Sequence, residues 1–425
     1  MTHQDLSRRE FLIAAAATLP LSVEENAPID LTQCRAQYQE AKRLLRRLVV
    51  KLPFGTKPVL ASTPANSLFG YAMWAETSML EGLLYAGDDP QVALGTHEIF
   101  FNTQRTDGLM PAVIFDKVPD FLNGHLEFGQ IQQMVPIART AWKLSQHLTD
   151  EAFLVRAYAS CSRFENWITA HRNTRGTGMV EMFCEYDLGL DYSPRVHGLG
   201  IPGSCPNHDA TNAVRTHGFP VLAPDLSAMA YGGRVALSKM AEALGRHQES
   251  QRWAEQADTL RNLIFKYCYD PQDQFFYDVD THGRFRKFRE TQLFLLCQEH
   301  VLTKDQFHII WDRYLHDPKQ YWLNYAFPSY SKADSHFRPR AGAWTGATFL
   351  NITLRTLLWM PYYLSRDEWH GYMRRWVSGM SRWSRWPSIV DPTTGNGFKG
   401  DIWDGQATVY LTFTEFVDRL EILPR

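Results

Sequence analysis

Two carboxylates four residues apart, Asp187 and Asp191, stand in the sequence Asp-Leu-Gly-Leu-Asp-Tyr-Ser-Pro-Arg, which ends at Arg195. Glycoside hydrolysis needs two carboxyl groups across the scissile bond, one of them protonated so that it helps the leaving group depart. Burial beside Asp187 would raise the pKa of Asp191 by desolvation and like-charge repulsion. The segment therefore predicts a site for a polyhydroxylated ligand, with Tyr192 and Arg195 alongside. The alternative is that both aspartates bond their own backbone as turn residues.

Further acids, aromatic residues and arginines gather in long segments that separate helical stretches. The segments are 105–126, 172–222, 315–341 and 383–403. A compact helical protein rarely keeps such long irregular segments unless they do chemistry. The candidate residues in or next to these segments, outside Asp187–Arg195, are Asp107, Arg338, Arg340, Trp344, Trp386, Asp391, Asp401, Trp403 and Asp404. Trp74 and Glu76 are further candidates and lie on a probable helix end nearer the start of the chain.

Helical periodicity recurs from about residue 30 to the end of the chain. Helices are predicted near 30–51, 69–86, 89–104, 127–147, 150–171, 223–244, 247–266, 285–298, 303–314, 342–359, 364–382 and 404–420. Local sequence supports several of these ends: a closing glycine, an N-cap with a first-turn proline, and two capping boxes. These residues are Gly87, Asp89 with Pro90, Thr303 with Gln306, and Ser365 with Glu368.

These helices form six pairs without strand–helix alternation, and this pattern predicts an all-α fold, an (α/α)6 toroid of nested helical hairpins. The long segments would gather at one end around a funnel, and short strands could form inside them, for instance at residues 275–278. The second choice is an open α-solenoid, which is disfavoured because no fixed repeat is present.

The N-terminus predicts export. Arg8 and Arg9 precede a short apolar run from Ile13 to Leu21, a pattern typical of twin-arginine signals. Residues 1–27 are therefore predicted to be a signal segment and 28–425 the toroid, with the Tat translocase as a partner and the periplasm or another extracytoplasmic space as the destination. The alternative is a chance arginine pair before an alanine-rich helix. The run is too short to span a bilayer in the mature protein, so no integral membrane span is expected.

Composition and cysteine spacing narrow the classes of partner, ligand and cofactor that the chain could bind. The formal net charge of -2 and the lack of a basic stripe argue against a nucleic-acid partner. The aromatic content of 13% suits a cleft in which flat rings stack on sugars. Six cysteines lack CxxC spacing, so a zinc or iron–sulfur site is not expected. The predicted glycosidic chemistry needs no metal or organic cofactor. A disulfide between Cys184 and Cys205 would fit an oxidising compartment; unpaired buried thiols are the alternative.

Several short motifs follow one another in a recognisable order. They are Trp74-Ala-Glu76, Gln104-Arg-Thr-Asp-Gly-Leu-Met-Pro111, Gln132-Gln-Met-Val135, the segment from Asp187 to Arg195, Arg340-Ala-Gly-Ala-Trp344 and Asp391-Pro-Thr-Thr-Gly395. This order resembles the six-hairpin glycosidase clan of trehalase and glycoside hydrolase family 63, which includes mannosylglycerate and glucosylglycerate hydrolases. The match around Asp191 is the specific part.

The resemblance implies an inverting hydrolase of carbohydrate metabolism that acts on a small α-linked glucoside, mannoside or oligosaccharide. Asp191 corresponds to the general acid of these enzymes. The positions that would bind substrate are Trp74, Glu76, Gln132, Asp187, Tyr192, Arg195, Arg340, Trp344 and Trp403. For Trp344 and Trp403 the alternative is core packing, because tryptophan is commonly mostly buried. A weaker hypothesis pairs Tyr192 with His197 as the acid and base of a polysaccharide lyase.

One position departs from the family pattern. The family's general base is a Glu three residues before Asp391, and Ser388 stands there. A neighbouring carboxylate, from Asp391, Asp401 or Asp404, could act instead if it lies roughly 6.5–9.5 Å from the acid. Phosphate could replace the activated water, which would make the protein a phosphorylase, or the toroid could bind carbohydrate without cleaving it. Hydrolysis with a displaced base, foremost Asp391, is preferred because the acid motif is so complete.

Overall fold

The computed structural model describes residues 30–132, 136–197, 199–341, 344–380, 387 and 389–398. The predicted signal segment, the helix at 404–420 and the candidate residues Trp386, Ser388, Asp401, Trp403 and Asp404 lie outside these residues.

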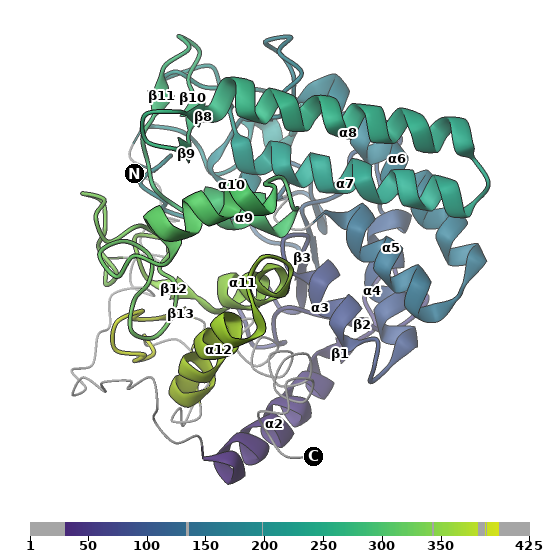
Figure 1. Ribbon diagram of the computed structural model, residues 1–425. Coiled ribbons are helices and arrows are strands. Elements are labelled where there is room, and N and C mark those ends of the chain that lie inside the picture. The colour runs from purple at the N-terminus through teal and green to yellow at the C-terminus, as the bar shows by residue number, and fades with distance from the viewer. Residues whose placement is uncertain are drawn as a thin grey trace.

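Helical hairpins build the molecule (Figure 1). Within the described ranges, consecutive inner helices pack against one another: α3 on α5, α5 on α7, α7 on α9 and α9 on α11. Their bounds are Ser78–Tyr85 for α3, Ile137–Leu148 for α5, Pro224–Ala243 for α7, Gln292–Gln298 for α9 and Leu350–Tyr363 for α11. Each is followed by a short turn and an outer helix. The outer helices are α4 (Pro90–Asn102), α6 (Glu151–His171), α8 (His247–Cys268), α10 (Lys304–Ile310) and α12 (Arg366–Met380). Helix α2 (Leu31–Leu45) precedes the first hairpin.

Long connections lead into the N-terminal ends of the inner helices, and they contain small antiparallel sheets. One sheet joins β3 (Ala72–Trp74), β4 (Val113–Phe115) and β5 (Leu126–Glu127). A second runs in the order β11 (Phe285–Arg286), β10 (Asp278–Val279), β7 (Val221–Leu222) and β6 (Glu181–Met182). Two-stranded pairs are β1 (Val49–Val50) with β2 (Val59–Leu60), β8 (Tyr269–Asp270) with β9 (Phe275–Phe276), and β12 (Thr348–Phe349) with β13 (Ile389–Val390). The short strands predicted at 275–278 are confirmed.

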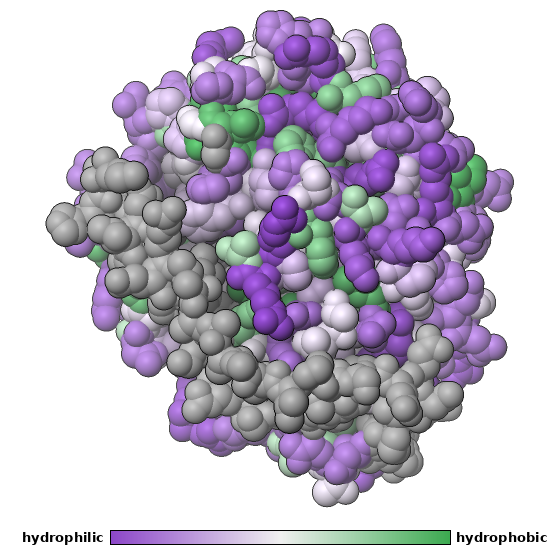
Figure 2. All heavy atoms as spheres, turned by 90° about the vertical axis from the view of Figure 1, so that its left-hand side faces the viewer, coloured by the Kyte–Doolittle hydropathy of each residue, from purple (hydrophilic) through white to green (hydrophobic). Residues whose placement is uncertain are grey.

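Four short helical turns complete the elements of the described residues. They are η1 (Arg46–Leu48), η2 (Glu185–Leu188), η3 (Pro206–His208) and the π-helical η4 (Trp311–Leu315). The loop end of the molecule faces the viewer in Figure 2, where hydrophilic residues predominate over the coloured surface and only small hydrophobic areas lie between them. Such a surface suits a polar ligand.

Several predicted helices begin later than expected. The helices predicted to start at 69, 127, 285 and 342 start at Ser78, Ile137, Gln292 and Leu350. The apolar residues before the first two of these fit a strand as well as a helix, and pairing with β4 decides between the two. The three signals for helix starts are confirmed, because Asp89 accepts hydrogen bonds from the first turn of α4 and both capping boxes form.

No helix in the described ranges combines the length and the apolar character that a membrane crossing requires.

Candidate active site

Asp191 lies in a loop with a closed base. We define the Asp191 loop as residues 184–205. Its two legs pair through backbone hydrogen bonds from Glu185 to Pro202 (3.0 Å) and from Tyr186 to Gly203 (2.9 Å). Asp191 itself is partly exposed, as is Tyr192 next to it. The loop precedes α7, so it belongs to the end of the molecule where the long connections gather.

Asp187 is part of the scaffold under this loop. Its side chain is fully buried and forms an ion pair with Arg172, which donates to both carboxylate oxygens. The backbone N–H groups of Ile131 and Phe183 donate to the same carboxylate at 3.1 Å and 2.7 Å. The prediction that Asp187 binds substrate is therefore wrong, because the carboxylate has neither exposed surface nor free acceptor sites. Its charge is neutralised by Arg172, so it does not supply the like-charge repulsion expected for Asp191.

Arg195 is likewise buried, with 1% of its side chain exposed. Its guanidinium contacts Asp225 in the first turn of α7 (Nη1 to Oδ2, 2.5 Å) and Asp278 of β10 (Nε to Oδ2, 2.6 Å). A third carboxyl, Glu290, lies 3.4 Å from Nη1. The prediction that Arg195 binds sugar is corrected, since every donor faces a protein carboxyl. We call this group the Arg195 cluster.

Protonation of Glu290 limits the negative charge of the Arg195 cluster. Burial raises the pKa of Glu290 from 4.5 to about 8, and the nearby guanidinium of Arg195 opposes this only in part. At neutral pH Glu290 is therefore protonated and adds no negative charge beside Asp225 and Asp278. Ser193 hydrogen bonds to Glu290, which ties the Asp191 loop to the cluster at a second point.

Glu185, which the sequence did not single out, contacts Tyr192, the residue that follows Asp191. Its carboxylate accepts a hydrogen bond from the backbone N–H of Tyr192 and lies 3.6 Å from Nδ1 of His197. The rings of Tyr192 and His197 meet edge to face at 4.9 Å, so the structure does bring together the pair considered for a lyase. Tyr192 has a φ of 63°, a left-handed conformation that is strained for a tyrosine and typical of functional turns.

The other predicted residues at this end are Trp74, Glu76 and Gln132. Trp74 ends β3, is partly exposed, and meets Phe69 and Phe115 edge to face. Glu76 is partly exposed in the following turn. Gln132 is buried with a φ of 42°, and it follows the Ile131 N–H that bonds Asp187. This bond fixes the segment of Gln132 beside the Asp191 loop.

The segment predicted to supply the base has a different character. Asp391 is buried, and its Oδ1 accepts hydrogen bonds from the backbone of Thr393 (2.9 Å) and Thr394 (3.2 Å), as a turn residue does. The Nε of Arg340 lies 3.8 Å from Oδ2, and 72% of the Arg340 side chain is exposed. Trp344 is 3% exposed and stacks on Phe349 at 5.0 Å, so the core-packing alternative replaces its predicted sugar contact.

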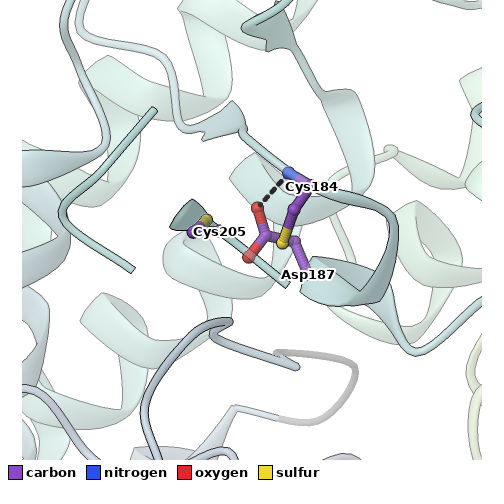
Figure 3. A group of neighbouring side chains, drawn as sticks. All are labelled: Cys184, Asp187 and Cys205. Carbon is purple, nitrogen blue, oxygen red and sulfur yellow. Dashed lines mark hydrogen bonds between the residues drawn. The ribbon is translucent and has the colours of Figure 1, made fainter. Parts of the chain in front are cut away.

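One group of side chains in the described part of the chain could supply three metal ligands: Cys184, Asp187 and Cys205 (Figure 3). Their ligand atoms lie within 4.8 Å of one another. However, the Arg172 guanidinium occupies the Asp187 carboxylate and also lies 3.9 Å from the Cys205 sulfur. A metal cation would have to displace this positive charge, so the group does not fit a metal site.

A hollow of about 670 Å³ lies away from Asp191. It is lined by residues of α3, α5 and α7, by Gln298 at the end of α9 and by Leu358 of α11, and Arg139, Lys143 and Lys239 face it together with the buried Glu299. No residue of the Asp191 loop lines this hollow, so it does not form part of the candidate site.

Comparison with known proteins agrees with the hairpin architecture. The family model of the mannosylglycerate hydrolase MGH1-like glycoside hydrolase domain matches residues 71–403. No curated protein gives a significant match. Among solved structures, the GH63 mannosylglycerate hydrolase from Thermus thermophilus in complex with Tris superposes with a TM-score of 0.71 at 16% identity, covering 89% of this chain and 100% of that one. Neutral trehalase from Saccharomyces cerevisiae gives 0.61 at 13% identity, covering 86% and 76%. These likenesses confirm the predicted (α/α)6 fold.

Proposed function

This chain belongs to the MGH1-like glycoside hydrolase family and is a glycosidase, and on that premise we propose that it is an inverting enzyme with Asp191 as general acid. Its substrate would be a small α-linked glucoside or mannoside, or a short oligosaccharide. The observation that carries the proposal is the contrast within the Asp191 loop: Asp191 is partly exposed, whereas the charged residues four positions before and after it are buried in ion pairs.

In the proposed reaction, Asp191 gives its proton to the glycosidic oxygen as the bond from that oxygen to the anomeric carbon breaks. Water attacks the anomeric carbon from the opposite face and gives a proton to a base, so the configuration inverts. The fixed legs of the Asp191 loop would hold the carboxyl at one distance from the bond, which lowers the entropic part of the activation barrier.

Asp391 remains the proposed base, and it is a described carboxyl of the segment 383–404. Its Oδ1 bonds the turn formed with Thr393 and Thr394, so only Oδ2 is suited to accept a proton from water. Arg340 lies near that oxygen and would have to turn toward the substrate first. Asp401 and Asp404 are the alternatives, and both lie outside the described residues.

Phosphorolysis is the second candidate. It is favoured by one observation, the exposed guanidinium of Arg340 beside a segment with Ser388 in place of a glutamate. Arginine binds phosphate oxygens in a fixed fork geometry, and phosphate needs no base to attack.

The test uses the purified protein and a panel of α-linked glucosides and mannosides, with and without inorganic phosphate. Free sugar released without phosphate, appearing first as the β-anomer by proton NMR, is the expected result. A sugar phosphate formed only with phosphate would replace hydrolysis by phosphorolysis, and a first-formed α-anomer would overturn the inverting mechanism. In the same assay, Asp305→Asn serves as the matched control for Asp191→Asn, because Asp305 is an exposed carboxyl in the first turn of α10.

Export through the twin-arginine pathway is part of the proposal and rests on Arg8 and Arg9. Expression in a bacterium followed by cell fractionation should recover the full chain outside the cytoplasm. Replacing both arginines by lysine should retain it in the cytoplasm, and an unchanged distribution would contradict the export proposal.

A further inference from the structure

The base of the Asp191 loop brings two thiols together. Cys184 and Cys205 are both buried, with 0% and 2% of their surface exposed. Their sulfur atoms lie within 4.8 Å of each other, beside the carboxylate of Asp187 (Figure 3). One cysteine begins the loop and the other ends it.

Backbone contacts, rather than flexible side chains, hold the two cysteines close. The N–H of Cys205 donates to the carbonyl of Gly129 at 2.7 Å, and the Cys184 sulfur lies 3.8 Å from the same oxygen. Gly129 permits this approach, since a Cβ there would lie 2.5 Å from Oε1 of Glu127 and 3.0 Å from the Cβ of Ser204. The paired legs from Glu185 onward add two further bonds next to the thiols.

The burial of the two thiols gives them different roles in oxidation. Cys205 keeps the greater exposed fraction, 2% against 0% for Cys184. Burial raises the pKa of the Cys184 thiol, which disfavours its reactive thiolate form. Cys205 is therefore suited to attack an oxidant first and Cys184 to resolve the mixed disulfide that results.

We propose that Cys184 and Cys205 form an intramolecular disulfide that closes a ring of the 22 residues from Cys184 through Cys205, with Asp191 inside it. The oxidant is a disulfide compound, R–S–S–R. The Cys205 thiolate attacks one of its sulfurs and releases one thiolate; the Cys184 thiolate then attacks the Cys205 sulfur and releases the second. The two cysteine protons end on the two released thiols, so R–S–S–R is reduced to two R–SH.

The proposal is independent of the role of Asp191 in catalysis, because it rests on the contacts at the base of the loop. A closed ring lowers the conformational entropy of the unfolded chain. It also keeps the two ends of the Asp191 loop together when the backbone hydrogen bonds between its legs open. Since both thiols are buried, the oxidant reaches them only when the loop opens. Oxidation should therefore be slow in the folded protein and faster in mild urea.

The test incubates the purified full chain with oxidised glutathione, unfolds it, blocks the remaining thiols by alkylation and maps the peptides by mass spectrometry without reduction. The expected product is one peptide pair, containing Cys184 and Cys205, that is lighter by two hydrogens and separates on reduction. The thermal midpoint should rise by roughly 3–6 °C on oxidation. Hydrogen exchange at the amides of Glu185 and Tyr186 should become slower.

Two variants sharpen the result. Cys205→Ser should abolish the linked pair and the rise in the midpoint, whereas Cys161→Ser, which removes a buried thiol of α6, should leave both unchanged. The decisive measurement is made on the unaltered chain, so a variant that fails to fold does not weaken it. Full alkylation of both Cys184 and Cys205 after oxidation, or their linkage to other cysteines, would overturn the proposal.

Discussion

The Asp191 loop and the segment around Asp391 are held in place in opposite ways. Buried ion pairs fasten the Asp191 loop to α6, α7 and β10 through Arg172 and Arg195. The Asp391 segment instead depends on its own turn, on the pairing of β12 with β13, and on an exposed Arg340. Removing one partner of a buried ion pair leaves an unpaired charge and strongly destabilises the fold, whereas a hydrogen-bonded turn tolerates substitution. The Asp191 loop therefore preserves one fixed geometry, while the Asp391 segment has room to differ from the family pattern.

Among the variants that test this comparison, Arg195→Met should have the largest effect on stability. It leaves the carboxylates of Asp225 and Asp278 buried without their cation, so the free energy of unfolding should fall by about 3–5 kcal/mol. Urea denaturation measures the loss. A fall of less than about 1 kcal/mol would show that the Arg195 cluster does not hold the fold.

Asp187→Asn and Asp191→Asn distinguish the roles of the two aspartates of the motif. Asp187→Asn removes the partner of the buried Arg172, so we expect a loss of about 3 kcal/mol in the free energy of unfolding. The matched variant Asp191→Asn changes a partly exposed residue and should stay within about 0.5 kcal/mol of the unaltered protein. Equal losses in the two variants would remove the distinction between a scaffold aspartate and a functional one.

Glu290 makes stability depend on pH. Its pKa is about 8 in the folded protein and near 4.5 when unfolded, so the folded state binds the extra proton between these values. The stabilisation is full below pH 4.5 and is lost as the pH rises through 8, a change on the order of 4 kcal/mol for this group alone. Glu290→Gln cannot titrate, so the difference in unfolding free energy between the unaltered protein and the variant should fall over this window. A constant difference from pH 4.5 to 8 would contradict the assignment.

The smallest expected effect on stability belongs to Arg340→Met. Because Arg340 is mostly exposed, its ion pair with Asp391 should contribute no more than about 1 kcal/mol to folding. If Arg340 binds the substrate, the variant should instead raise KM while the thermal midpoint stays the same. A large loss of stability would mean that the Asp391 segment is fastened as firmly as the Asp191 loop.

The sequence predicts this molecule well where the determinants are local. Asp89, Pro90 and the two capping boxes lie next to the helices they begin, and the hairpins follow from helical periodicity. The prediction from sequence fails where an apolar run fits both the helical and the strand periodicity. Residues 72–74 are such a run, and they form β3 because they pair with a strand some forty residues away.

Within the site, residue types could not separate Asp187 from Asp191, because a cation fifteen residues earlier, at the end of α6, decides the matter. Arg195 was misassigned for the same reason: its partners Asp225 and Asp278 lie 30 and 83 residues along the chain. No local signal in one sequence reveals such pairs. Glu185, by contrast, stands six residues before Asp191 in the same loop, and that nearness was the available signal.

The most direct test of the acid role compares the turnover of Asp191→Asn with that of the unaltered enzyme on two substrates with the same sugar. One carries an alkyl leaving group, which needs a proton to depart, and the other carries dinitrophenol, which does not. The account predicts a loss of roughly 10²–10⁴-fold in kcat on the alkyl glycoside and less than about 10-fold on the dinitrophenyl glycoside. Unchanged turnover of the alkyl glycoside, or equal losses on both substrates, would contradict Asp191 as the proton donor.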